Sequence, residues 1–231
     1  MSDVMLEWLA AIGAAAVPEL ADAGGIAASA AAARLRRLEV SGLVQTVRML
    51  HGKPALVVIT RAGLRVAGRD ELAPPRVSSS GFVHLLECGR VARALERACA
   101  GSHSVHSERE LRAWERDGGR VVASAELRFG ARGARELHRP DLVCVPLRDG
   151  LPVAIEVELT VKAPARLREI VRGWARCRCV AGVVYYAAPA ALRALERAIA
   201  DERAGAVVQA LELVRAGELP GRSTSPIPSG P

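Results

Sequence analysis

Residues 138–174, HRPDLVCVPLRDGLPVAIEVELTVKAPARLREIVRGW, predict two strands and a helix in succession. The runs DLVCVPL (141–147) and PVAIEVELT (152–160) are typical of strands, and the Arg-Asp-Gly turn between them predicts a hairpin. Pro164 suits the first turn of a helix. Apolar side chains then recur at helical spacing, at Leu167, Ile170, Val171 and Trp174. The stretch therefore predicts a strand–turn–strand–helix unit.

Two acids interrupt the second apolar run. Glu156 and Glu158 stand two residues apart, so in a strand their side chains share one face, about 6.7 Å apart at the backbone. Asp141 begins the preceding strand, and Lys162 follows four residues after Glu158. Burying a charge is costly unless a partner compensates it. The sequence therefore predicts that these charged side chains share a compensating partner at the end of the hairpin.

The flanking sequence alternates between strand and helix patterns. After residue 174 come a buried strand, a second helix that begins at a proline, and a last strand (180–188, 189–205 and 206–213). This alternation predicts parallel pairing, whereas the hairpin is antiparallel, so a mixed sheet is expected. Upstream, residues 82–100 and 106–119 are typical of helices, and 120–129 has strand character. His103 and His106 are expected in a loop.

The N-terminal third has a different plan. Three helices are expected, at 3–12, 17–25 and 26–44, followed by strand, turn and strand (45–60) and a short helix (61–68). Three helices followed by a two-stranded ribbon are the plan of a winged helix. We therefore expect an α+β chain of two domains: a winged helix-turn-helix at 1–69, a linker at 70–80, a second domain at 81–219 and a disordered tail at 220–231.

Charge supports a nucleic-acid role for the first domain. Between Arg34 and Arg69 there are eight basic residues and one acid, Glu39. A helix-turn-helix places its second helix in the major groove, and a wing contacts backbone phosphates. The residues expected to face double-stranded DNA are Ser29, Ala31, Arg34 and Arg37 on the helix, and Arg48 and Lys53 on the wing. The alternative is a small helical domain with solvated arginines.

Composition limits the function classes. The chain has 231 residues, a net charge of +7 and 3% aromatic residues, which favours an anionic partner but not a stacking surface for single strands. The five cysteines are scattered and have no zinc-ligand spacing, so reduced thiols are expected. Because no signal-peptide pattern and no membrane-length apolar run occur, we expect a soluble cytoplasmic protein without membrane contact.

The acids suggest metal-dependent chemistry. Asp141, Glu156 and Glu158 can converge on a hard cation such as Mg²⁺, with Mn²⁺ as a substitute, because such ions prefer carboxylate oxygens. A metal held there could orient water for attack on a phosphodiester, and Lys162 would stabilise the charge on the phosphate. A metal-dependent endodeoxyribonuclease is therefore one expectation.

These motifs resemble a known pattern. The "RPD" of residues 139–141, followed by "EVE" (156–158) and Lys162, resembles the PD-(D/E)xK nuclease superfamily. With "FVHLLECGRV", "SERELR" and "RLREIVRGW", the chain from residue 1 to about 215 resembles the replication-relaxation family. The resemblance implies a winged helix joined to a PD-(D/E)xK-like domain, with a mixed sheet flanked by helices. It also implies a role in plasmid replication or mobilisation, with plasmid replication or relaxase proteins as partners; homodimerisation stays open.

Carried over by residue, the resemblance assigns Asp141 and Glu156 to the superfamily's acids and Glu108 to the acid of the early helix. It departs at Glu158, where the superfamily has lysine; Lys162 is the candidate replacement. Two alternatives stay open. One is a DNA-binding regulator or accessory factor whose nuclease-like domain does not cut. The other is purely structural, with Glu156 and Glu158 paired to arginines such as Arg166 or Arg168.

Overall fold

The hairpin at the centre of the sequence is present in the computed structural model. Strands β7 (Leu142–Pro146) and β8 (Val153–Glu158) pair antiparallel, with Leu142 opposite Ile155 and Cys144 opposite Val153. The turn between them contains Gly150 at φ 152°, a backbone conformation that side chains rarely adopt. The predicted strand–turn–strand is thus confirmed.

The structure describes residues 3–119, 121–129 and 135–213, and its contacts divide the chain into two units, Met1–Leu95 and Glu96–Pro231. The division falls inside helix α5 (Phe82–Ala98) and not in the segment 70–80, which has neither helix nor strand. The physical reason is that most of α5 packs on the N-terminal unit. The expected tail, 220–231, lies outside the described residues.

The N-terminal unit begins with helix, short strand, helix, helix: α1 (Val4–Ile12), β1 (Ala14–Ala15), α2 (Val17–Ala23) and α3 (Ala28–Val40). Two strands and a helix follow, β2 (Val44–Val47), β3 (Leu56–Ile59) and α4 (Arg61–Val66). The strands form an antiparallel sheet of order β1-β3-β2. The sequence predicted every one of these elements except β1, which is only two residues long.

A small apolar core joins α5 to this sheet. Phe82 and Leu86 of α5 pack with side chains of β1 and β3, among them Ala14, Leu56 and Val58. Gly89 allows a close approach, because a Cβ there would lie 3.4 Å from the Ala14 carbonyl oxygen. Two ion pairs add to the contact: Arg90 with Glu19, at 3.7 Å, and Arg93 with Asp22, at 2.6 Å.

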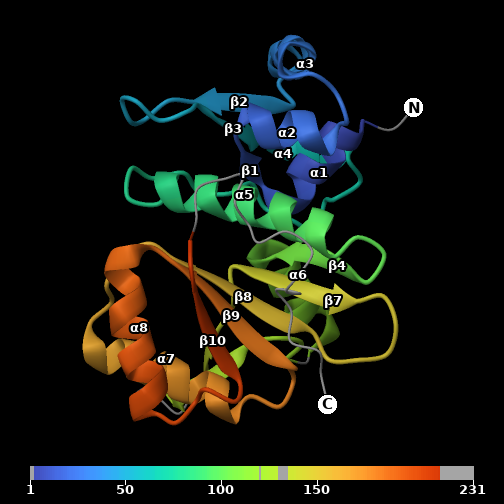
Figure 1. Cartoon of the computed structure of the whole chain (residues 1–231). Helices are drawn as coiled ribbons and strands as arrows, with labels where there is room; N and C mark the ends of the chain where they lie inside the picture. Colours follow the sequence, from blue (N-terminus) through green and yellow to red (C-terminus); the bar gives the residue numbers. More distant parts are fainter. Residues whose placement is uncertain (1–2, 120, 130–134, 214–231) are drawn as a thin grey trace. The chain divides into compact units, whose positions relative to one another are not determined.

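The C-terminal unit is built on a mixed five-stranded sheet of order β10-β9-β8-β7-β4 (Figure 1). Strands β8, β9 (Gly182–Ala187) and β10 (Val208–Glu212) are parallel, while β7 and β4 (His103–Ser107) are antiparallel neighbours. Helix α6 (Glu108–Gly118) follows β4, and β5 (Ala125–Phe129) pairs with β6 (Arg135–His138). The expected mixed sheet is confirmed.

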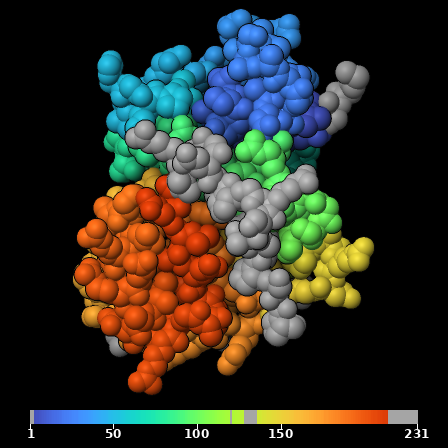
Figure 2. Space-filling view, viewed as in Figure 1, coloured from blue at the N-terminus to red at the C-terminus, as the bar shows by residue number. Residues whose placement is uncertain are grey.

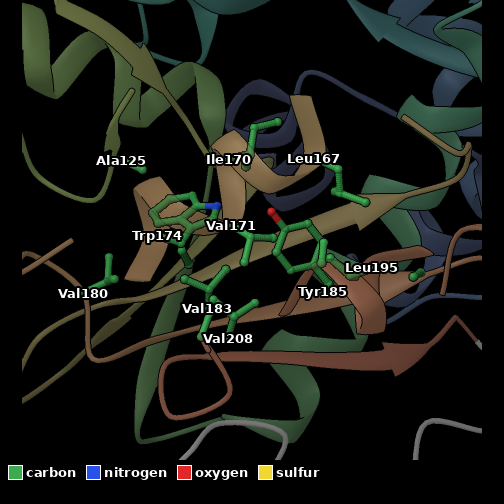
Figure 3. Packing of buried hydrophobic residues seen from close by; sticks show 14 of the residues in the cluster. Ala125, Leu167, Ile170, Val171, Trp174, Val180, Val183, Tyr185, Leu195 and Val208 are labelled. Carbon is green, nitrogen blue, oxygen red and sulfur yellow. The ribbon is translucent and has the colours of Figure 1, made fainter. Parts of the chain in front are cut away.

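Helices α7 (Pro164–Arg176) and α8 (Pro189–Asp201) complete the core of this unit. The predicted stripe of α7 faces inward: Leu167, Ile170, Val171 and Trp174 are all buried. They pack with Val183 and Tyr185 of β9 and with Leu195 of α8 (Figure 3). Both helices begin at a proline, as expected.

The prediction of a loop at His103 and His106 is wrong, because both residues lie in β4. The run HSVHS has a single apolar residue, Val105, and so lacks the apolar pattern of a buried strand, but β4 is at the edge of the sheet, where polar side chains reach solvent. Over the described residues, no helix has both the length and the apolar character needed to cross a bilayer.

Candidate functional site

The acids lie where β7 and β8 end. Since Leu142 pairs with Ile155, the next position along the ladder sets Asp141 opposite Glu156. On the other side of β8, Glu156 pairs with Tyr185 and Glu158 with Ala187 of β9. The sheet therefore gathers Asp141, Glu156, Glu158 and Tyr185 within one small region.

Glu156 is buried, and its Oε1 accepts from two side chains. Its side chain is 8% exposed, and its Oε1 lies 2.6 Å from Nε2 of His138. The indole Nε1 of Trp174 donates to the same oxygen at 3.3 Å. Burial raises the pKa of Glu156, the charge of Asp141 adds to that rise, and the His138 hydrogen bond opposes it.

His138, the hydrogen-bond partner of Glu156, has a shifted pKa. Burial lowers its pKa, but the hydrogen bond and the negative charge of Glu156 outweigh this, so that the net pKa is raised above the ordinary value. The imidazole ring also packs edge to face against the indole ring of Trp174, and the two ring centroids lie 5.7 Å apart. The structure thus identifies His138 as a hydrogen-bond partner of Glu156.

Glu158 is paired with Lys162. The lysine Nζ donates to Oε2 of Glu158, whose side chain is 7% exposed while that of Lys162 is 37% exposed. Lys162 follows the end of β8 and turns back to the strand it has just left. Lys162, the candidate replacement for the superfamily's lysine, thus lies beside Glu158, with its ammonium at the solvent side of a buried carboxylate.

Asp141 and Glu108 both take part in hydrogen bonds with the backbone. Asp141 Oδ2 accepts from the Val157 amide at 2.8 Å, which ties the start of β7 to the end of β8. The Glu108 amide donates to the Asp141 carbonyl oxygen at 2.9 Å, so α6 begins beside the same point. The Glu108 carboxylate, however, pairs with Arg112 at 2.5 Å on an exposed face.

Glu156 and Glu158 are closed off from solvent, at only 6% and 5% exposed. Among the described residues, the structural alternative of pairing with Arg166 or Arg168 is not observed. Arg166 contacts Glu136 and Glu169, and Arg168 lies 3.8 Å from Asp201. The side chains that hold the acids are a histidine and a lysine.

Tyr185 has a larger part in the site than the sequence indicated. Its side chain is 1% exposed, and its hydroxyl makes no hydrogen bond among the described residues. Figure 3 shows this hydroxyl directed toward the indole nitrogen of Trp174. Burial and the neighbouring carboxylates raise the pKa of Tyr185 well above its ordinary value, so the phenol stays neutral. Tyr185 belongs to the site because it pairs with Glu156 across the sheet, and the sequence alone does not give that pairing.

Glu115 of α6 is another buried acid, and it pairs with the residue that follows His138. Its Oε2 accepts from Nε of Arg139 at 2.8 Å, and its Oε1 accepts from the Ser124 hydroxyl at 2.6 Å. Because Arg139 directly follows His138, this ion pair helps to fix the imidazole beside Glu156. The sequence signal was weak, since Glu115 stands in an ordinary charged helix.

The donor set suits Mg²⁺ in kind but not in its present arrangement. Carboxylate oxygens are the ligands that Mg²⁺ prefers. Yet within the described residues neither Glu156 nor Glu158 belongs to a group of three ligand atoms within 4.8 Å of one another. Both acids also already accept from side-chain donors. In this conformation, His138 and Lys162 bind the carboxylate oxygens that a metal would require.

The expected DNA-facing residues are mostly at the surface of the N-terminal unit. Ser29, Arg37, Arg48 and Lys53 are exposed. In Figure 2, α3 projects at the top of the view in blue, with the lighter tip of the hairpin to its left. Arg34 is partly engaged, because its Nε donates to Asp3 at 2.8 Å. Exposed Arg36 adds to this basic surface.

The expectation for Ala31 is wrong. Ala31 is 0% exposed, and so cannot face DNA. Leu35, one helical turn later, is buried as well, so these two residues mark the inward side of α3. The outward side of α3 is therefore defined by Ser29, Arg36 and Arg37.

Comparisons with known proteins do not identify a family. No protein-family model matches the chain, and a search of curated proteins gives no match either. The function must therefore be argued from the arrangement of the residues themselves.

Proposed function

We propose that this chain is a DNA-binding protein of the replication-relaxation type, in which a winged helix-turn-helix directs a nuclease-like domain to double-stranded DNA. The observation that carries the proposal is the exposed basic surface of the N-terminal unit. It combines Arg36 and Arg37 on α3 with Arg48 and Lys53 on the β2–β3 hairpin. A helix and a hairpin that are both exposed and basic suit a major groove and its flanking phosphates.

The order of elements supports this reading. Helix, short strand, two helices and a two-stranded hairpin follow one another, and α2 and α3 are joined by only the residues 24–27. Such a short connection between two helices is typical of a helix-turn-helix. The hairpin connection, 48–55, is long enough to act as a wing.

The C-terminal unit supports the nuclease-like part of the proposal. An edge strand, a hairpin carrying the acids, a helix and a parallel strand occur in the order expected for a PD-(D/E)xK domain. Asp141, Glu156 and Lys162 lie together, as the resemblance implies. These similarities favour a common plan without requiring that the domain cuts DNA.

Between the two forms of the proposal, the non-cleaving one fits the geometry better. Glu156 and Glu158 are buried and already paired with His138 and Lys162. Metal-dependent cleavage would require both of these side chains to move aside. We therefore favour an accessory or regulatory role in plasmid replication or mobilisation, and keep a Mg²⁺-dependent nuclease as the second candidate.

One experiment separates the candidates. Purified protein is incubated with supercoiled plasmid, with Mg²⁺, with Mn²⁺ or with a chelator, and nicking and gel mobility are recorded. Glu156→Gln, which keeps the shape of the side chain, is the matched variant, and its folding is checked by circular dichroism. A mobility shift without nicking supports the regulator. Metal-dependent nicking that Glu156→Gln abolishes supports the nuclease. No shift at low salt contradicts DNA binding altogether.

A further inference from the structure

The segment after α7 brings two thiols together. Cys177 ends the helix, with its amide donating to the Trp174 carbonyl oxygen at 3.0 Å, and its backbone is extended (φ −66°, ψ 129°). The chain then bends at residues 178 and 179. The Sγ atoms of Cys177 and Cys179 lie 3.1 Å apart.

We propose that Cys177 and Cys179 form a redox-active dithiol, which a hydroperoxide oxidises to an intramolecular disulfide. A disulfide has an S–S bond of about 2.0 Å, so the two sulfurs need to approach by only about 1 Å. Both side chains are half-buried, and the neighbouring Arg176 and Arg178 are exposed, so a small oxidant can reach the pair. The pair is not used by the proposed DNA-binding function.

The electrostatics of the pair assign different roles to the two thiols. The hydrogen bond from Cys179 lowers the pKa of Cys177 to about 7, so a large share of Cys177 is thiolate at neutral pH. The same hydrogen bond raises the pKa of Cys179, which therefore remains a thiol. Cys177 is thus the attacking sulfur, and Cys179 is the sulfur that resolves the first product.

The reaction balances with hydrogen peroxide as the oxidant. The Cys177 thiolate attacks one peroxide oxygen, the O–O bond breaks, and the departing hydroxide takes a proton to become water. Cys177 is then a sulfenic acid. Because its negative charge is gone, Cys179 can lose its proton and attack Cys177 Sγ, releasing a second water. Two thiols and one peroxide give one disulfide and two waters.

Two of the three remaining cysteines, Cys99 and Cys144, are internal references. Cys99 and Cys144 are buried, and burial raises the pKa of both, that of Cys144 to about 12. Thiols of this kind are poor nucleophiles at neutral pH. They should stay reduced under conditions that oxidise the Cys177–Cys179 pair, which makes selectivity measurable within one molecule.

Arg178 supplies a direct readout. The full-length protein is treated with hydrogen peroxide, its free thiols are alkylated, and it is digested with trypsin, which cleaves after Arg176, Arg178 and Arg193. A disulfide holds the dipeptide 177–178 to the peptide 179–193, and reduction separates them. We expect this linked species, lighter by two hydrogen atoms than its reduced parts, while Cys99 and Cys144 remain free to be alkylated after unfolding.

Two variants make the test decisive. In Cys179→Ser the sulfenic acid of Cys177 should persist and be trapped by dimedone, whereas Cys177→Ser should give neither trapping nor a linked peptide. Alkylation of Cys177 in the untreated protein should be half-maximal near pH 7. Full alkylation of both thiols after peroxide, or a disulfide from either to another cysteine, would overturn the proposal.

Discussion

Nε2 of His138 lies 2.6 Å from Oε1 of Glu156, although the two residues are 18 positions apart in the chain. This contact ties β6 to β8, and it neutralises a carboxylate that is buried among apolar side chains. Replacing His138 by Ala should leave Glu156 without its main partner and destabilise the C-terminal unit by about 1–3 kcal/mol. Urea denaturation would measure the loss. His51→Ala, at an exposed position of the hairpin, is the control and should have no effect; equal stability of the two variants would contradict the role of His138.

The Glu158–Lys162 pair makes a second prediction about stability. Lys162→Met should leave the buried carboxylate of Glu158 uncompensated, at a cost of about 1–3 kcal/mol. Adding Glu158→Gln should recover part of the loss, and a double-mutant cycle would give the coupling. The exposed pair Glu108–Arg112 has the same spacing along the chain and should couple by about 0.3–0.5 kcal/mol. Equal coupling in both cycles would argue against a compensating role for Lys162.

Glu19 should make stability depend on pH. Burial raises its pKa above the ordinary 4.5, and its Oε2 has no hydrogen-bond partner among the described residues. Because the folded state holds this proton more tightly, the stability of the folded state falls as pH rises from about 4.5 through the raised pKa. Glu19→Gln removes this dependence, so the variant should gain stability relative to wild type as pH increases. Thermal unfolding of wild type and Glu19→Gln at a series of pH values measures this difference, and a difference that stays constant over the series would contradict the prediction.

The proposed DNA surface predicts a specific salt response. Arg37→Ala and Lys53→Ala should each weaken binding to double-stranded DNA, and each should reduce the slope of log K against log salt by about 1. Fluorescence anisotropy at several salt concentrations would measure both. Arg193→Ala, at an exposed position of α8, is the matched control and should change neither. Equal losses for all three variants would mean that only net charge matters.

Gly63 lies close against the backbone of Leu43 in the N-terminal unit. A Cβ at this position would lie 2.1 Å from the carbonyl oxygen of Leu43, an atom that already accepts from Thr60. Backbone cannot move aside cheaply, so Gly63→Ala should destabilise the unit by about 1–3 kcal/mol. Gly205 has nothing within 4 Å of its Cβ position, and Gly205→Ala should stay within about 0.5 kcal/mol of wild type. Chemical denaturation of both variants provides the comparison.

Local pattern was enough for most of the fold. The alternation of strand and helix after residue 180 predicted the parallel strands, and Pro164 and Pro189 predicted where α7 and α8 begin. The sequence missed β6, a strand of four residues. It also missed β1 and β4, which are short or polar edge strands. Their hydrogen bonds come from neighbours distant in the chain, and no local pattern records such pairing.

Spacing along one hairpin was enough to identify the charged residues of the candidate site, Asp141, Glu156, Glu158 and Lys162. Which side chains bind them depends on the three-dimensional packing. It brought His138 and Trp174 to Glu156, turned Ala31 inward, and placed Cys177 against Cys179. The physical reason is that burial depends on which faces pack together, and periodicity specifies that a face is apolar without specifying which side chains meet it.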